Sequence, residues 1–479
     1  MSIKIQLTAV IAAFLAMCNS SLAQGSLTPP GAPAPTMRSL DQIEARTPIS
    51  SAPFIINQPG SYYLTTNVSV VAGAVISIAT NDVVIDLNGF YLKGGGGIFV
   101  GGSVSNLTVR RGSIKNAGRG VGFGGIPNCR IEDLTIIGNS GDAIEVGDNA
   151  VVRRCTLDGN NGFGVVATPI SGANVVAEDC VIRSNSFGGI SLGVDVVVRN
   201  CVLQGNGTNG ITLGANGRVK GCQAIQNQNA GISIGAGGVV SETLAEGNSG
   251  LGISVGDFGT IDHCNALQNS SAGISSGNNC SVENCNVSQN SSGGILTGNN
   301  SSIASCIAQR NTGVGISGGS SNRAYNCTAA ANTSNGLFAG DGSQMLDCEA
   351  SGNGGRGILV NRYCAVSGCT ATGNSQSGIY VGWFSGYILN NTCTANNTLN
   401  STLEAGIVID DSDNRVDGNH VARNGYAGIM VISSYINNVV VRNSVAGNGA
   451  NNYLGTNGND FGPISTAAAA TSPWANISH

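Results

Sequence analysis

Residues 222–235 read CQAIQNQNAGISIG, and this pattern returns every 21 residues from Asn185 to Ile379 without a gap. Each row carries a Cys, an Asn five residues later, and a Gly-aliphatic pair four residues after the Asn. A fixed period of about 20–50 residues is the signature of a solenoid. The Asn column comprises Asn185, Asn206, Asn227, Asn248, Asn269, Asn290, Asn311, Asn332, Asn353 and Asn374.

The residues between these columns follow the pattern of short strands. Ile232 and Ile234 are apolar while Ser233 between them is polar, and no row holds an apolar run at helical spacing. Gly and Asn tolerate the left-handed conformation of tight corners, so they divide each row into short segments. Successive rows would pair as parallel strands about 4.8 Å apart, and chain chirality favours right-handed crossovers. The sequence therefore predicts an all-β fold, a single-stranded right-handed parallel β-helix of about 21 residues per coil.

The columns also have physical reasons. Like charges stacked at about 4.8 Å would repel by about 1 kcal/mol even in water, and only 10% of the residues are charged. Stacked Asn amides donate to one neighbour and accept from the other, which predicts a structural ladder. The Cys column, running from Cys180 to Cys369 with Thr243 in one place, is predicted to face the core as free thiols. Disulfides within it are left open.

The chain resembles the right-handed parallel β-helix, or pectin-lyase-like, superfamily. Its repeat is similar to that of bacterial exported β-helix proteins of unassigned function. The segments Leu40–Ser50, Pro59–Leu64 and Val83–Phe90 resemble the usual lead-in of these proteins. The resemblance implies the fold over nearly the whole mature chain, but it implies little about function because this fold hosts many functions.

Composition divides the chain into segments. Met1 to Ala23 has a basic residue, an apolar stretch and a small-residue cleavage site, as a secretory signal does. We therefore expect a secreted, periplasmic or cell-surface protein, and no later stretch is long and apolar enough to span a membrane. Trp474 is expected to plug the open C-terminal end. The expected segments are a signal peptide (1–23), a flexible linker (24–38), an N-terminal cap with a short helix (39–67), the β-helix (68–460) and a C-terminal tail or cap (461–479).

The period breaks twice. About four extra residues are expected between Val166 and Ala177. About seven residues more than a regular row are expected between Ile379 and Gly406. Aromatic residues are concentrated at the second break, and flat aromatic rings in a groove can bind the apolar faces of sugars. Aromatic packing that anchors the insert is the alternative. The carbohydrate-binding candidates are Tyr363, Tyr380, Trp383, Phe384 and Tyr387, of which Trp383, Phe384 and Tyr387 are predicted to lie in the inserted stretch.

The residue after each Gly-aliphatic pair faces outward and changes character along the chain. It is Ser or Thr from Ser191 to Ser275 and mostly apolar from Leu296 to Met430. An exposed apolar stripe indicates a binding surface. The alternative is that a loop or the C-terminal tail covers it.

Clustered carboxylates follow the second break at Asp410, Asp411 and Asp413. They are the catalytic candidates, since paired carboxylates serve glycosidases, whereas calcium binding and a solvated corner are the alternatives. His420, nearby, is expected to be buried. No metal site or cofactor is predicted, although calcium is left open. Relative to the resembled superfamily, the chain lacks the Asn-Thr-Asp, Gly-His-Gly and Arg-Ile-Lys motifs of polygalacturonases and the Asp-Pro-His motif of alginate epimerases.

Two functions remain. The first, which we favour, is an exported non-catalytic β-helix that binds a polysaccharide or cell-surface glycan or serves as a surface scaffold. The second is a polysaccharide-active enzyme, a glycoside hydrolase or polysaccharide lyase, with its site near Asp410. The net charge of −5 argues against nucleic acid as a partner. A monomer is expected, and the sequence does not identify the glycan.

Overall fold

The computed structural model describes residues 45–168 and 173–479. The predicted signal peptide, the linker, the helix expected to open at Ser39 and part of the loop expected after Val166 lie outside these residues. The chain divides into Met1–Arg46 and Thr47–His479, and the second unit carries the fold. No helix in the described ranges is long and apolar enough to cross a membrane.

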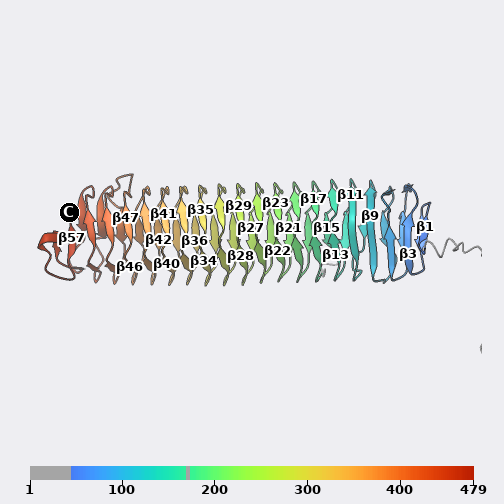
Figure 1. Ribbon diagram of the computed structural model, residues 1–479. Helices are drawn as coiled ribbons and strands as arrows, with labels where there is room; N and C mark the ends of the chain where they lie inside the picture. The colour runs from blue at the N-terminus through green and yellow to red at the C-terminus, as the bar shows by residue number, and fades with distance from the viewer. Residues whose placement is uncertain (1–44, 169–172) are drawn as a thin grey trace, which may run out of the picture. The chain divides into compact units, whose positions relative to one another are not determined.

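Each coil consists of three short strands separated by corners. In a typical coil, β21 (Ile211–Leu213), β22 (Arg218–Lys220) and β23 (Gln223–Ile225) follow one another. We call the three stacked sets of strands faces 1, 2 and 3, with β21 on face 1, β22 on face 2 and β23 on face 3. Each strand pairs in parallel with its counterpart one coil later, as Ile211 does with Ile232. Figure 1 shows the coils stacked one after another along a common axis from β1 to β57.

Face 1 contains nineteen strands in the described part of the chain, so the solenoid has about nineteen coils. This confirms the predicted all-β parallel solenoid of about 21 residues per coil. The strands of face 1 are β2 (Phe54–Ile56), β5 (Ile76–Ile78), β8 (Ile98–Val100), β10 (Val121–Gly122), β12 (Ile144–Val146), β15 (Val165–Ala167), β18 (Ile190–Leu192), β21, β24 (Ile232–Ile234), β27 (Ile253–Val255), β30 (Ile274–Ser276), β33 (Ile295–Thr297), β36 (Ile316–Gly318), β39 (Leu337–Ala339), β42 (Ile358–Val360), β45 (Ile379–Val381), β48 (Ala405–Ile409), β51 (Ala427–Val431) and β54 (Asn451–Leu454).

The solenoid extends further at both ends than expected. At the start, β1 (Thr47–Ile49) pairs in parallel with β3 (Gly60–Leu64), so coiling begins before residue 68 and the described residues of the expected cap are strands. At the other end, β57 (Asn476–Ser478) pairs with β53 (Ser444–Ala446), so the expected tail also continues the parallel pairing. These strands escaped prediction because they lie outside the regular 21-residue period.

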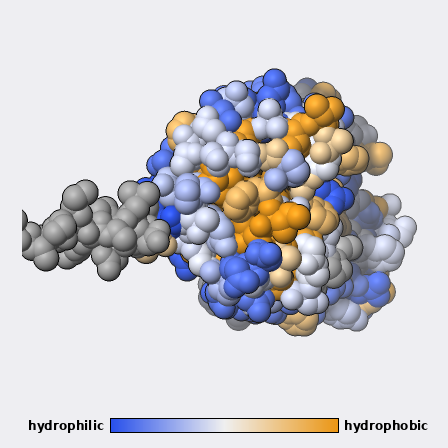
Figure 2. Space-filling view, turned by 90° about the vertical axis from the view of Figure 1, so that its right-hand side faces the viewer, coloured by the Kyte–Doolittle hydropathy of each residue, from blue (hydrophilic) through white to orange (hydrophobic). Residues whose placement is uncertain are grey.

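The two ends expose apolar groups differently. Figure 2 looks onto the end that begins with β1 and shows hydrophobic side chains near its centre with polar ones around them. At the C-terminal end, Tyr453 and Phe461 pack against the core and against each other, with ring centroids 6.4 Å apart. Trp474 is 51% exposed, so it does not plug this end as the sequence suggested.

Hydrogen bonds of the Asn column link successive coils. Asn227 is fully buried, and its Nδ2 donates to Asn248 Oδ1 at 3.0 Å and to the carbonyl of Leu203 at 3.1 Å. The Oδ1 atom of Asn227 accepts from the amide N–H and from Nδ2 of Asn206. Each rung therefore satisfies both polar ends of a buried amide, as a structural ladder requires.

The left-handed corner position and the Gly column serve different purposes, although the sequence pattern predicted that Gly and Asn form the corners. The left-handed residue precedes each Asn, as Gln226 does with φ of 53°. The Gly of the Gly-aliphatic pair is needed for space instead. A Cβ at Gly231 would lie 2.7 Å from the carbonyl oxygen of Gly252 and 2.8 Å from Nδ2 of Asn248.

The described residues contain fourteen free cysteines, all of them buried. Each thiol of the column lies close to a backbone carbonyl, as Cys222 does to that of Lys220 at 3.4 Å. Past Cys369 the column continues with Asn391, whose Oδ1 accepts from the amide of Cys369 at 2.8 Å. A second Asn ladder thus replaces the cysteines in the last coils.

The two period breaks lie at defined places. Asp148 bonds to Ala173 across 25 residues, which places the four extra residues of the first break in that coil. At the second break, Asn374 bonds to Asn396 across 22 residues, so only one extra residue lies in that coil. Asn396 then bonds to Asn424 across 28 residues. Most of the insert is therefore at residues 397–404, where Asn397 bonds to the carbonyl of Glu404, and Trp383, Phe384 and Tyr387 lie outside it.

Candidate functional site

Three turns between faces 1 and 2 stack on one another at residues 361–364, 382–386 and 410–414. The amide of Tyr363 donates to the carbonyl of Phe384 at 3.2 Å, and the amide of Ser385 donates to that of Ser412 at 3.3 Å. The structure thus brings the predicted acidic segment next to the predicted aromatic segment. We call this surface the turn ridge.

The three candidate carboxylates of the turn ridge help to build its corners. Asp413 is exposed and has φ of 61°, the left-handed corner position that Tyr363 occupies with φ of 59° two coils earlier. Asp411 Oδ1 accepts the amide of the next residue, Ser412, at 2.7 Å. Asp410 accepts the hydroxyl of Tyr380. Asp and Asn are favoured at such corners because they tolerate positive φ and bond locally.

Tyr380 is covered rather than free. The guanidinium carbon of Arg356 lies 3.4 Å from the centroid of the Tyr380 ring, and Arg356 also pairs with the buried carboxylate of Glu404 at 3.0 Å. Burial, together with the hydrogen bond to Asp410, raises the pKa of Tyr380 above its usual value. Because Arg356 occupies a ring face, Tyr380 does not offer that face to a sugar.

The remaining aromatic residues of the turn ridge are partly exposed. Tyr363 is 57% exposed and Trp383 is 50% exposed. Phe384 is half-buried and packs edge-on against Tyr363, with centroids 5.3 Å apart. These contacts fit an anchoring role.

The apolar stripe of face 1 is covered at its C-terminal end. Val408 and Met430 are buried in a small apolar cluster. Tyr426, Ile432 and Leu454 pack against this cluster. The alternative that neighbouring chain segments cover the stripe therefore applies to these two residues, while Leu296 and Leu359 remain half-buried.

His420 and Asp417 have environments that the sequence did not foresee. His420 is exposed, because Asn419 takes the ladder position and His420 pairs with Thr392 on the outward column. Asp417 is buried, at 3% exposure, between Arg415 at 2.7 Å and Arg442 at 2.5 Å. The hydrogen bonds from Arg442 and Arg415 hold the pKa of Asp417 below its usual value.

A pocket with an aromatic wall lies on face 2, beside the turn ridge. Tyr387, Arg415, Val439 and Asp460 are register partners on four successive strands, β46 (Tyr387–Leu389), β49 (Arg415–Asp417), β52 (Val439–Val441) and β55 (Asp460–Phe461). A pocket of about 460 Å³ lies over the last three strands and is bounded by Trp474. We call it the Trp474 pocket.

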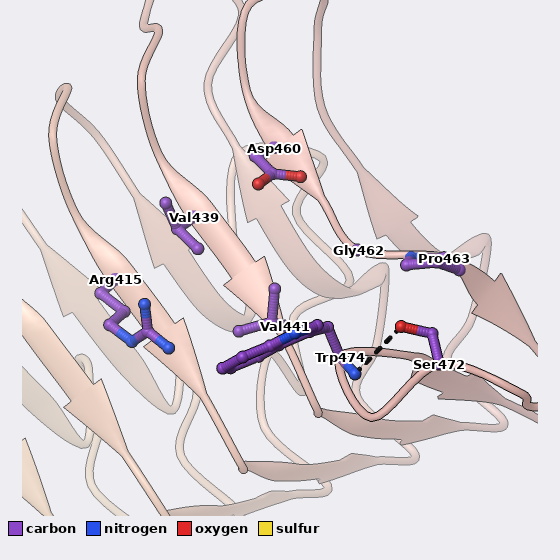
Figure 3. A pocket seen from close by; sticks show the side chains of 8 residues that line it. All are labelled: Arg415, Val439, Val441, Asp460, Gly462, Pro463, Ser472 and Trp474. Atoms are coloured by element: carbon purple, nitrogen blue, oxygen red, sulfur yellow. Dashed lines mark hydrogen bonds between the residues drawn. The ribbon is translucent and has the colours of Figure 1, made fainter.

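Figure 3 shows how the Trp474 pocket is lined. The side chain of Val439 lies between Arg415 and Asp460, and the indole of Trp474 lies beside Val441. The carboxylate of Asp460 is exposed. On another side, the guanidinium carbon of Arg442 is 5.3 Å from the Trp474 ring centroid. The pocket therefore combines an aromatic surface, a guanidinium and a carboxylate over an apolar floor.

Sequence reasoning identified Tyr387 and missed Arg415 and Asp460 as its neighbours. The three residues are 28 and 45 positions apart, because Tyr387 pairs with Arg415, Arg415 with Val439 and Val439 with Asp460. The 21-residue rule does not align them after the insert. Counting from the continuing Asn ladder would have aligned them.

The residues that the structure describes hold no group of three or more His, Cys, Asp or Glu side chains arranged to hold a metal ion. Neither the turn ridge nor the Trp474 pocket therefore gives positive support for calcium.

Comparison with known proteins places the chain among β-helices. It matches the family model described as the right handed beta helix region over residues 60–195, 251–394 and 319–462. No curated protein matches it.

Several solved structures are similar at low sequence identity. The Dettilon tailspike protein gp208 shares 14% identity, with 60% of this chain and 64% of that chain covered and a TM-score of 0.40. The A-module of mannuronan C-5 epimerase AlgE6 from Azotobacter vinelandii shares 16% identity, with 88% and 91% covered and a TM-score of 0.24. The tailspike protein gp49 from Acinetobacter baumannii bacteriophage Fri1, a capsular polysaccharide depolymerase, shares 10% identity, with 64% and 57% covered and a TM-score of 0.28. The chain thus spans less than two thirds of the length of either tailspike.

Proposed function

The chain belongs to the right-handed β-helix family, and from this premise we propose that it is an exported, non-catalytic protein that binds a neutral glycan in the Trp474 pocket. The export part of the proposal rests on the signal-like segment Met1–Ala23. N-terminal sequencing of protein recovered outside the cytoplasm would test it, with cleavage after Ala23 as the expected result.

The chemistry of the Trp474 pocket carries the proposal. Sugar rings present apolar C–H faces and polar hydroxyl edges, so their sites combine an aromatic ring with a few placed polar groups. Trp474 supplies the ring at 51% exposure. Asp460 supplies an acceptor, while Arg415 supplies donors beyond those that bond Asp417. The charges of Arg415 and Arg442 are balanced by those of Asp417 and Asp460, so the surroundings of the pocket carry no net charge, which favours a neutral sugar.

The same face can accommodate more than one sugar. Tyr387 is 55% exposed and lies three strand steps from Asp460, a distance of about 14 Å at about 4.8 Å per step. An oligosaccharide lying across the coils would therefore reach from Trp474 toward the Tyr387 ring. Tyr387 is the member of the sequence-predicted aromatic set that this proposal retains.

The non-catalytic part rests on the engagement of the candidate carboxylates. Asp410 accepts a hydrogen bond from Tyr380, Asp411 caps its own turn and Asp413 occupies a left-handed corner. These are turn-building roles, and the Trp474 pocket does not include any of the three. A glycosidase needs two carboxyl groups flanking one bond.

Binding and cleavage can be tested together. The mature chain, residues 24–479, would be incubated with cellulose, chitin, dextran, pectin and alginate, and both bound protein and new reducing or unsaturated ends would be measured. The expected result is binding of a neutral polymer without cleavage. New chain ends that disappear in Asp411→Asn would establish an enzyme and refute the proposal.

Two tryptophans provide matched variants. Trp474→Ala is expected to weaken binding at least about tenfold, since aromatic anchors in interfaces commonly contribute 1–2 kcal/mol or more. Trp383→Ala, which removes a ring of similar exposure from the turn ridge, is expected to leave affinity within about twofold. Loss of binding in Trp383→Ala alone would move the site to the turn ridge.

A further inference from the structure

A second pocket lies on the outward side of face 1 near the other end of the solenoid. Phe99, Gly122 and Glu145 are register partners on β8, β10 and β12. Farther along, this outward column holds Ser or Thr from Ser191 to Ser275. At Phe99, Gly122 and Glu145 it holds an aromatic ring, no side chain and an acid instead. These residues, with Arg119 and Thr168, line a pocket of about 320 Å³.

Gly122 leaves the space between the ring and the acid. A Cβ at this position would lie 3.2 Å from Cδ2 of Phe99 and 3.7 Å from Oε2 of Glu145. Phe99 itself is 44% exposed, so part of the ring remains open to solvent, whereas Glu145 is only 5% exposed although it points away from the core. The pocket thus has an open aromatic wall beside a nearly buried carboxyl group.

The polar groups of this pocket are fixed by contacts with one another. Arg119 Nη1 lies 3.3 Å from Glu145 Oε2, and Arg119 Nε lies 3.3 Å from Oε1. Arg119 remains half-exposed, and a guanidinium has five N–H donors, so donors are left for a ligand.

The balance of charge favours an uncharged ligand. Arg119 and Glu145 form an ion pair, so their charges offset each other within the pocket. An uncharged ligand leaves this pair intact, whereas an anion would compete with Glu145 for Arg119 and a cation would compete with Arg119 for Glu145.

We propose that the pocket formed by Phe99, Arg119 and Glu145 is a second carbohydrate site that takes a neutral pyranose ring. The C–H face of the sugar would lie on Phe99, and vicinal hydroxyls would bond to the carboxyl oxygens of Glu145 and the free donors of Arg119. A pocket of this size falls at the lower end of the range for small-molecule sites. Two residues set the form of this pocket: Gly122 leaves it open, and Arg119 holds the carboxylate of Glu145 in place.

This inference is independent of the Trp474 pocket. The two sites are on different faces, and twelve strand steps separate β12 from β48, which begins the coil of Arg415. That corresponds to about 58 Å along the stack at about 4.8 Å per step. A short oligosaccharide cannot occupy both, whereas a long polysaccharide could bind both and gain avidity.

The test uses small neutral probes and removes the first site. Saturation-transfer NMR would be recorded with the methyl pyranosides of glucose, galactose and mannose and with methyl glucuronide, on the mature chain carrying Trp474→Ala. Transfer to at least one neutral pyranoside is expected. Adding Phe99→Ala should weaken binding about tenfold or more, and adding Glu145→Gln should weaken it to a similar extent, because hydrogen bonds to charged groups contribute about 1.5–3 kcal/mol.

Phe258→Ala is the matched control, because Phe258 is also a surface phenylalanine, 68% exposed, outside both pockets. It should leave transfer unchanged. The proposal is overturned if no neutral pyranoside shows transfer, if only methyl glucuronide does, or if Phe99→Ala leaves the signal intact. In the single variant Phe99→Ala, which keeps Trp474, any remaining saturation transfer comes from the Trp474 pocket. This variant therefore shows whether the Trp474 pocket binds a sugar independently of the pocket at Phe99. Phe99 is exposed, so its removal tests binding without loss of the fold.

Discussion

Replacing one rung of the Asn ladder should destabilise the solenoid far more than replacing an exposed Asn of the neighbouring coil. Asn290 is fully buried, and its Nδ2 donates to Ala266 O and to Asn311 Oδ1, both at 3.0 Å. Its Oδ1 accepts from the amide and from Nδ2 of Asn269, both at 3.0 Å. Asn290→Ala removes all four hydrogen bonds and leaves buried partners without their bond.

The expected loss follows from these four bonds. A buried hydrogen bond contributes about 1 kcal/mol net, and an unsatisfied buried partner adds a cost of its own. The free energy of unfolding should therefore fall by about 4 kcal/mol. Asn265→Ala in the preceding coil removes an exposed, outward side chain and should change the free energy of unfolding by less than about 0.5 kcal/mol.

Urea unfolding followed by far-UV circular dichroism measures both variants. The comparison uses the urea concentration at the unfolding midpoint, and it requires that the unfolding free energy depends on urea with the same slope in each variant. A changed slope would mean that part of the solenoid unfolds separately. A loss of less than about 1 kcal/mol in Asn290→Ala, or equal losses in the two variants, would refute the view that the ladder stabilises the coils through its hydrogen bonds.

Three further predictions concern the rest of the fold. The hydrogen bond from Arg442 is the main cause of the lowered pKa of Asp417, so the stability it contributes is present above the usual carboxyl value near pH 4 and is lost as pH falls through the lower folded value. In thermal unfolding, Asp417→Asn should lose about 3 kcal/mol at pH 7, and a gap from wild type that persists undiminished at pH 2 would contradict this. Gly294→Ala should lose about 2 kcal/mol in urea unfolding, because its Cβ would lie 2.4 Å from a backbone carbonyl, whereas Gly101→Ala, with nothing within 4 Å, should be almost neutral. The fourteen buried thiols should react with Ellman's reagent only after denaturant is added, and rapid reaction of the native protein would show that the column is accessible.

The 21-residue rows were sufficient to predict the parallel solenoid, because each column maps to one physical requirement. Asn227 needs a polar partner above and below, and Gly231 needs space for the next backbone. The family match confirms the right-handed β-helix. The strands before residue 68 and after residue 460 were missed since their pairing does not keep the period.

The candidate site was predicted less completely than the fold. Tyr380 and Asp410 were expected to be available, but a tyrosine that Arg356 covers and a carboxylate that bonds to it cannot be recognised from spacing. Trp474 was predicted to plug the open C-terminal end, and this was wrong: it is exposed, because Tyr453 and Phe461 pack against the core instead. Such competition for the core is set by three-dimensional packing, so the sequence pattern does not reveal it.

The most direct test of the central claim uses the fact that the chain has only two tryptophans. Trp383→Phe leaves Trp474 as the only indole, and Trp474→Phe leaves Trp383. Each variant would be titrated with the neutral glycan that binds best while tryptophan emission is followed. Binding in the Trp474 pocket predicts a saturable change in emission from Trp383→Phe and none from Trp474→Phe. A response from Trp474→Phe alone would place the glycan on the turn ridge and contradict the account.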